Sequence, residues 1–163
     1  MKTLELIKKA FALEPVERIP WVPFVGVHGG FLTGQDAETY LKSSEEIVKG
    51  VSKAIEEYNP DGIPVAFDLQ IEAEVLGCEL KWSETGPPAV VSHPLAEGKT
   101  LDDLNIPAST DGRIGLTIEA AKILREKYPD IALYGLITGP FTLALHLMGT
   151  DIFMKLFEAP EEV

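Results

Sequence analysis

Short apolar runs alternate with longer amphipathic segments along this chain, and the alternation restricts the folds open to it. Trp21–Val27, Gly62–Phe67 and Ile131–Ile137 are almost continuously apolar, as in strands buried on both faces of a parallel sheet. The expected helices are Thr3–Leu13, Asp36–Asn59, Leu69–Leu76, Thr110–Tyr128, Pro140–Met148 and Asp151–Phe157. Strands that alternate with helices predict βα units, and therefore an α/β fold with a mainly parallel sheet.

Local signals refine the expected boundaries. Ser43 and Glu46 have capping-box spacing, which predicts that a second helix begins within the segment 36–59. Asn59 precedes a proline, so the helix should end there. Gly77 follows the 69–76 helix at a position typical of a C-terminal cap. Pro160 has the position of a first helical residue and predicts the start of a further helix.

Residues 78–107 have a different pattern, of strands and turns. Glu79–Trp82 and Ala89–Ser92 flank the turn sequence Gly86-Pro87-Pro88, which predicts a small β-excursion from the parallel sheet.

Charge and length exclude several classes of protein. The 163 residues are enough for one domain spanning 1–163, with 26 acidic against 14 basic residues and a net charge of −12. This balance argues against nucleic acid or an anionic membrane surface as a partner. The chain has no apolar run of ~18 residues, no secretory leader pattern and a single cysteine, so a cytoplasmic location is expected.

Polar residues follow each predicted strand, where parallel α/β folds bind ligands. These residues are His28, Asp68 and Thr138. Asp68 is interpreted either as a helix N-cap or as a carboxylate that binds a cationic or N–H-bearing group. Glu72, four residues further on, should share the face of Asp68, whereas Glu74 should not.

The other chemically active residues have alternative interpretations. His146 lies between leucines and is either a core histidine or a site residue, while His93 precedes a proline in an expected solvated loop. His28 is interpreted as a general acid or base, as a metal ligand or as a loop histidine near a turn. Cys78 is expected to be a small buried residue. The histidines and Cys78 form no close pair of ligands, so no metal site is predicted within this chain.

Two segments resemble the uroporphyrinogen decarboxylase superfamily. Residues 61–77 resemble its second-strand signature, centred on Phe67-Asp68-Leu69, and residues 135–144 (GLITGPFTLA) resemble its G-x-x-G-x-P-[FW]-T-L-A segment. Arg18-Ile19-Pro20 and residues 160–163 match the usual flanks. The resemblance implies an N-terminal half of a (β/α)8 TIM-type barrel, because such a barrel typically needs ~250 residues.

Within this superfamily the chain is more similar to the corrinoid-dependent methyltransferases, such as the methylcobamide:coenzyme M enzymes. The decarboxylases place two arginines after the first strand to bind substrate carboxylates, and residues 24–30 contain none. Asp68 matches the key aspartate of the decarboxylases, and their barrel tyrosine aligns with His146. The resemblance implies that Asp68 and His146 are catalytic, and that substrate is bound by His28, Thr138, Glu72 and Phe141.

In the methyltransferase branch, zinc lowers the pKa of an acceptor thiol, which attacks the methyl group of a methylated corrinoid. The zinc ligands of that branch, a His-x-Cys pair and a later cysteine, belong to the C-terminal half. This chain alone is therefore expected to bind no cofactor, with zinc and a corrinoid implied for the complete enzyme.

Three functions are compatible with the sequence. The first is the N-terminal half of such a methyltransferase, the second is uroporphyrinogen decarboxylation or a related tetrapyrrole lyase, and the third is a non-catalytic half-barrel that works through assembly. The expected partners are a methylated corrinoid or corrinoid protein, a small thiol or a tetrapyrrole, and either a C-terminal-half polypeptide or a second copy in a homodimer.

Overall fold

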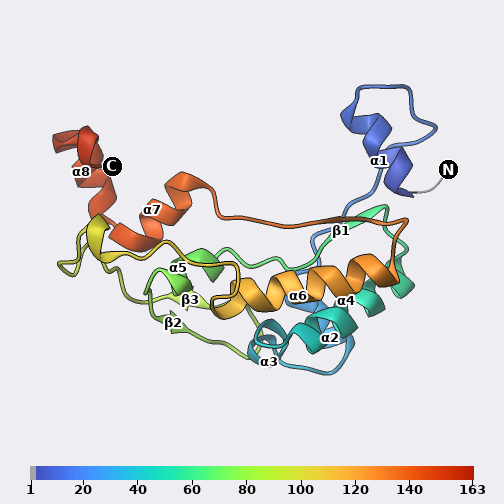
Figure 1. Cartoon of the computed structure of the whole chain (residues 1–163), viewed down its shortest axis with the longest axis horizontal. Coiled ribbons are helices and arrows are strands. Elements are labelled where there is room, and N and C mark those ends of the chain that lie inside the picture. Colours follow the sequence, from blue (N-terminus) through green and yellow to red (C-terminus); the bar gives the residue numbers. More distant parts are fainter. Residues whose placement is uncertain (1–2) are drawn as a thin grey trace.

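A computed structural model describes residues 3–163 (Figure 1). Its helices are α1 (Thr3–Phe11), α2 (His28–Leu32), α3 (Ala37–Leu41), α4 (Ser44–Tyr58), α5 (Ile71–Val75), α6 (Gly112–Lys127), α7 (Pro140–Met148) and α8 (Asp151–Glu158). The strands are β1 (Gly62–Pro64), β2 (Leu80–Lys81), β3 (Ala89–Val90) and β4 (Ala132–Tyr134), and two 3-10 turns, η1 (Leu101–Asp103) and η2 (Pro160–Glu162), complete the list. The molecule is elongated, with α1 at one end and α7 and α8 at the other (Figure 1).

β1 and β4 form the parallel pair that the alternation of strands and helices predicts. Ile63 is in register with Leu133, and the core that surrounds β1 is built largely from α4 and α6. Gly62 is required at the start of β1, because a Cβ there would lie 2.9 Å from the carbonyl oxygen of Ala132. β1 ends at Pro64, short of the expected Phe67, and the Val65 N–H adds one more bond to the Tyr134 carbonyl.

The prediction of a strand at Trp21–Val27 is wrong. The carbonyl of Trp21 accepts the Asp61 N–H at 2.9 Å, but no strand forms, because Pro20 and Pro23 lack the N–H groups that a ladder needs. Gly26 then turns the chain with a φ of +51°, and α2 begins at His28. His28 therefore starts a helix and does not lie in a loop.

Helix α4 begins at a side-chain cap and ends at a residue in the left-handed region. The Ser43 hydroxyl accepts the Glu46 N–H, so the predicted second start within 36–59 is confirmed as the N-terminus of α4. Asn59 ends α4 in the left-handed region, with a φ of +47°. Glycine at position 50 lets α4 approach α2, since a Cβ there would lie 2.5 Å from the Gly29 carbonyl oxygen.

The β-excursion is also confirmed. β2 and β3 pair antiparallel, with Leu80 opposite Val90 and Lys81 opposite Ala89. Gly77 has a φ of +100° directly after α5, as expected of a C-terminal cap. None of the helices within residues 3–163 is both long and apolar enough to cross a membrane.

Asp61 anchors the N-terminal segment to the start of β1. Its carboxylate is 2% exposed and accepts Arg18 Nη1 at 2.6 Å, Arg18 Nη2 at 2.5 Å and the Trp21 N–H at 2.8 Å. The hydrogen bonds from Arg18 hold the pKa of Asp61 below its usual value. A paired, buried carboxylate at this point fixes the chain that precedes the sheet.

We expect Asp61→Asn to lower the free energy of unfolding by about 2–3 kcal/mol at neutral pH, because the variant loses charge-assisted hydrogen bonds in a buried place. A lowered folded-state pKa stabilises the fold above the unfolded value of ~3.9 and ceases to do so as the pH falls through the folded value. The difference between wild type and variant in urea denaturation should therefore shrink at low pH. Asp102→Asn, at an exposed aspartate, is the control, and a pH-independent difference would contradict the prediction.

Candidate functional site

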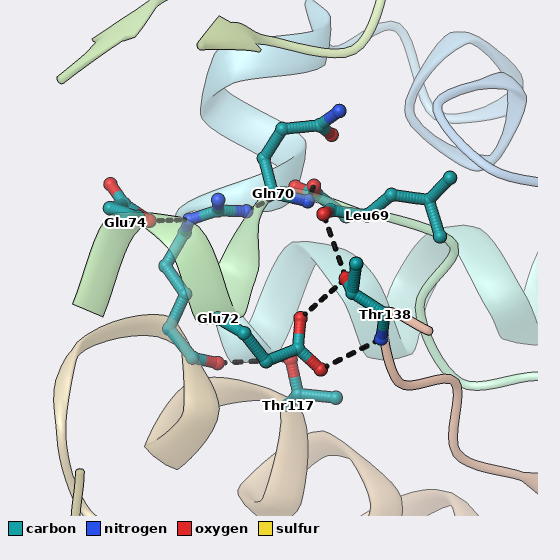
Figure 2. A network of polar contacts seen from close by, with 8 residues as sticks. Leu69, Gln70, Glu72, Glu74, Thr117 and Thr138 are labelled. Atoms are coloured by element: carbon teal, nitrogen blue, oxygen red, sulfur yellow. Dashed lines mark hydrogen bonds and ion pairs between the residues drawn. The ribbon is translucent and has the colours of Figure 1, made fainter. Parts of the chain in front are cut away.

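Thr138 ties the end of β4 to the segment that follows β1. Its hydroxyl lies 2.8 Å from the Leu69 carbonyl oxygen and 2.9 Å from Glu72 Oε2, and its N–H donates to Glu72 Oε1 at 3.1 Å (Figure 2). Thr138 itself is buried. Two of the predicted site residues, Thr138 and Glu72, are thus brought into direct contact.

Asp68 is fully engaged in contacts within the chain. It is 3% exposed, its Oδ1 accepts the Gln70 N–H at 2.8 Å, and its Oδ2 pairs with Arg113 Nη1. Helix α5 begins only at Ile71, with Gln70 in the N-cap position, so Asp68 closes an Asx-type turn before the helix and does not cap it. Both carboxylate oxygens of Asp68 already have partners.

The expectation that Glu72 and not Glu74 joins Asp68 is reversed in the structure. Glu74 Oε2 accepts Arg113 Nε at 2.5 Å, so Asp68 and Glu74 share one guanidinium, while Glu72 turns to Thr138. The rule that residues four apart share a helix face applies only within a helix, and Asp68 precedes α5.

Arg113 is the central residue that sequence reasoning missed. It is 5% exposed, and its guanidinium lies over the Trp82 ring, 4.9 Å from the centroid. A signal for it exists, because Arg113 lies in the first turn of α6, where the helix dipole disfavours a cation. An arginine at that position indicates nearby carboxylates that compensate for the dipole.

His28 faces the same side of the molecule as Asp68. It is exposed at the start of α2, and its Nε2 lies 2.7 Å from the Tyr58 hydroxyl. A cavity of about 330 Å³ is lined by His28 and Asp68 together with Phe24 and Phe67, whose rings are 4.9 Å apart. The structure therefore places His28 and Asp68 on one cavity, although His28 begins a helix and does not follow a strand.

His146 and Phe141 lie on α7 in different surroundings. Burial, and secondarily the nearby His93, lower the pKa of His146, and its Nε2 is buried without a hydrogen-bond partner among the described residues. The prediction that His93 is solvated is wrong. His93 is half-buried, and its Nδ1 donates to the His146 carbonyl at 2.8 Å. Phe141 is 52% exposed and packs on Phe153, away from Asp68.

The donor set of this chain does not fit a zinc ion. Within residues 3–163 no group of three or more His, Cys, Asp or Glu side chains is arranged to hold a metal. Cys78 is 4% exposed, its Sγ donates to the His146 carbonyl, and burial raises its pKa to about 11. A thiol in this state is a poor source of the thiolate that zinc requires.

Comparisons with known proteins identify a common family. The family profile described as Uroporphyrinogen decarboxylase (URO-D) matches residues 2–163. The methylcobamide:CoM methyltransferase MtbA of Methanosarcina acetivorans is 30% identical over 98% of this chain and 48% of its own length. MtaA of Methanosarcina barkeri is 35% identical over 58% of this chain and 29% of its own length.

A solved structure shows the same architecture. A methyltransferase from Methanosarcina mazei superposes with a TM-score of 0.84 at 28% identity, covering 99% of this chain and 49% of that one. The α/β arrangement with its parallel pair is therefore that of half a barrel of this kind. The chain spans about half the length of the full-length relatives that it matches.

We expect Arg113→Met to lower the free energy of unfolding by about 3–5 kcal/mol, because Asp68 is left as a buried carboxylate without its cation. Adding Asp68→Asn should restore part of that loss. Lys122→Met, at an exposed lysine of the same helix, serves as the control in urea denaturation. Equal losses for Arg113→Met and Lys122→Met would refute the role given to the ion pair.

Cys78 should react slowly in the native chain. With a pKa of about 11 its thiolate fraction at pH 8 is roughly a hundredth or less of that of a free cysteine, and the side chain is also buried. Reaction with an aromatic disulfide reagent should be at least about a hundredfold slower than for the same chain unfolded in urea. A native rate within tenfold of the unfolded rate would mean that the thiol is accessible and ionised.

Proposed function

The chain belongs to the uroporphyrinogen decarboxylase family, and from that membership we propose that it forms the N-terminal half of a barrel enzyme that transfers a methyl group from a methylated corrinoid to a thiol. The observation that carries this proposal is the similarity over almost the whole chain to methylcobamide:CoM methyltransferases. The corrinoid, the thiol and the zinc ion belong to the proposal for the complete enzyme.

The electrostatics of the strand ends support methyl transfer over decarboxylation of a polycarboxylate. Such a substrate needs available cations, preferably arginines that bind each carboxylate through two hydrogen bonds. Arg113 is buried and already holds Asp68 and Glu74, and residues 24–30 supply no arginine. Arg18 is bound to Asp61 at the opposite end of β1.

The residues of this chain serve to shape and fix the cavity. Asp68, with Arg113, positions the turn after β1, and Thr138 with Glu72 positions the segment after β4. His28 contributes a polar group at the rim of the 330 Å³ cavity, and His146 a neutral imidazole nearby on α7. The zinc ligands come from outside this chain in the proposed enzyme, because its own donor set does not fit.

A second half of the barrel would complete the sheet. Among the described residues β1 pairs only with β4, and large apolar side chains beside the strands are exposed: Trp21 by 51%, Phe24 by 65% and Ile137 by 81%. A closed barrel removes such open edges and covers such side chains. We propose a C-terminal half of the same family as the covering partner, and a second copy of this chain is the alternative.

The decisive experiment assays the natural full-length protein with zinc, methylcobalamin and a small thiol such as 2-mercaptoethanesulfonate. We expect thioether formation together with demethylation of the corrinoid, and no activity from the 163-residue chain alone until a C-terminal half is added. A parallel assay follows carboxyl loss from uroporphyrinogen. Absence of methyl transfer from a folded, zinc-loaded full-length protein would refute the proposal, and carboxyl loss in its place would favour the decarboxylase.

A further inference from the structure

A second cavity adjoins the one at the strand ends. It measures about 470 Å³ and lies between the β2–β3 hairpin, the C-terminal end of α7 and Gln70. Gln70 and Pro87 line both cavities, so the two spaces meet at these residues. The Gln70 side chain points away from the Glu72–Thr138 contacts, as Figure 2 shows.

Two buried polar atoms at this cavity have no partner among the described residues. They are Oε1 of Gln70 and Nε2 of His146, which belong to side chains from different elements that line the same space. Buried polar atoms in native proteins are nearly always hydrogen-bonded, so an unsatisfied pair on one cavity indicates that a bound molecule, water or ligand, supplies the bonds. Oε1 of Gln70 can only accept a hydrogen bond, whereas an imidazole nitrogen donates or accepts according to its tautomer, so a group with a donor and an acceptor can satisfy both atoms.

The cavity is lined by no carboxylate and by no lysine or arginine among the described residues, although the chain carries a net charge of −12. The ionisable side chains in its lining are those of His93 and His146, and burial lowers the pKa of His146, which disfavours the charged form of that imidazole. Glu97 accepts the His93 N–H at 2.8 Å but does not line the cavity. A charged group placed here would lose its hydration without gaining a counter-ion, whereas a neutral hydrogen-bonding group would not.

We propose that this cavity is an amide subsite, formed around Gln70 and His146, which binds a neutral carboxamide on the periphery of the ligand. A primary carboxamide supplies a donor and an acceptor at one planar edge, which matches the two unsatisfied atoms. Corrinoids carry peripheral carboxamides, so the subsite would hold the edge of the methyl donor beside the strand-end cavity. This identification of the ligand rests on the function proposed above.

The subsite also discriminates between two macrocyclic ligands of similar size, a uroporphyrinogen and a corrinoid. The rim of a uroporphyrinogen carries carboxylates, and a cavity lined by no lysine or arginine offers them no bidentate partner. Corrinoid carboxamides keep their hydrogen bonds in the same place without a desolvated charge. The chemistry of the subsite therefore selects the amide-bearing macrocycle.

The test measures equilibrium binding of cyanocobalamin to the natural full-length protein. We expect Gln70→Leu to weaken binding at least tenfold. Gln35→Leu, at the chain's other glutamine and outside both cavities, should change it less than twofold. Derivatives of cyanocobalamin in which one peripheral carboxamide is hydrolysed to a carboxylate should bind the wild type more weakly, at least tenfold for one positional isomer. Thermal melting confirms that both variants fold.

The outcomes distinguish the subsite from the proposed function. If the wild type binds cobalamin and transfers methyl groups but Gln70→Leu binds equally well, the cavity holds only water and the subsite is refuted, while the function stands. If the wild type neither binds cobalamin nor transfers methyl groups, the proposed function fails and the corrinoid subsite fails with it. Equal binding of every carboxylate isomer would likewise overturn the inference.

Discussion

The ion pair between Arg113 and Asp68 is the interaction on which the arrangement of the strand ends depends. The side chain of Arg113 is 6% exposed and that of Asp68 is 0% exposed. A buried charge is tolerated only when its partner is held in place. Arg113 starts α6 and Asp68 ends the segment after β1, so the pair fixes a helix against a strand end. Glu74 adds a second carboxylate from α5. Three elements are thereby set relative to one another by one guanidinium.

The cavities follow from this constraint. With Asp68 turned towards Arg113, its Oδ1 closes the turn at Gln70, and the Gln70 side chain is directed away from the Glu72–Thr138 contacts (Figure 2). Gln70 then stands between the space lined by His28 and the space lined by His146. Asp68, which the resemblance implies to be catalytic, is thus held in contacts within the chain at the lining of the first cavity.

The sequence predicted those features that depend on local chemistry. Ser43 caps α4 and Pro140 begins α7, because a hydroxyl and a proline act within one turn of backbone. The strand expected at Trp21–Val27 failed because apolar character alone does not supply the N–H groups that a ladder needs. The partnership of Arg113 with Asp68 joins residues 45 positions apart, and only tertiary packing determines such a contact. The family resemblance predicted which residues form the site, but it did not indicate that Arg113 binds Asp68 and Glu74.

The distribution of charge shows what this half of a barrel contributes to chemistry. Of the acids at the strand ends, Asp68 and Glu74 share the single positive charge of Arg113, and Glu72 contacts the N–H and the hydroxyl of Thr138. Among the described residues, the buried polar atoms left without a partner near these acids include Oε1 of Gln70, Nη2 of Arg113 and Nε2 of His146. Such groups can orient a ring system by hydrogen bonds and apolar contact. In the methyl transfer that we propose, the thiol would be activated by groups from the other half of the barrel, because residues 3–163 contain no group of side chains arranged to hold a metal ion.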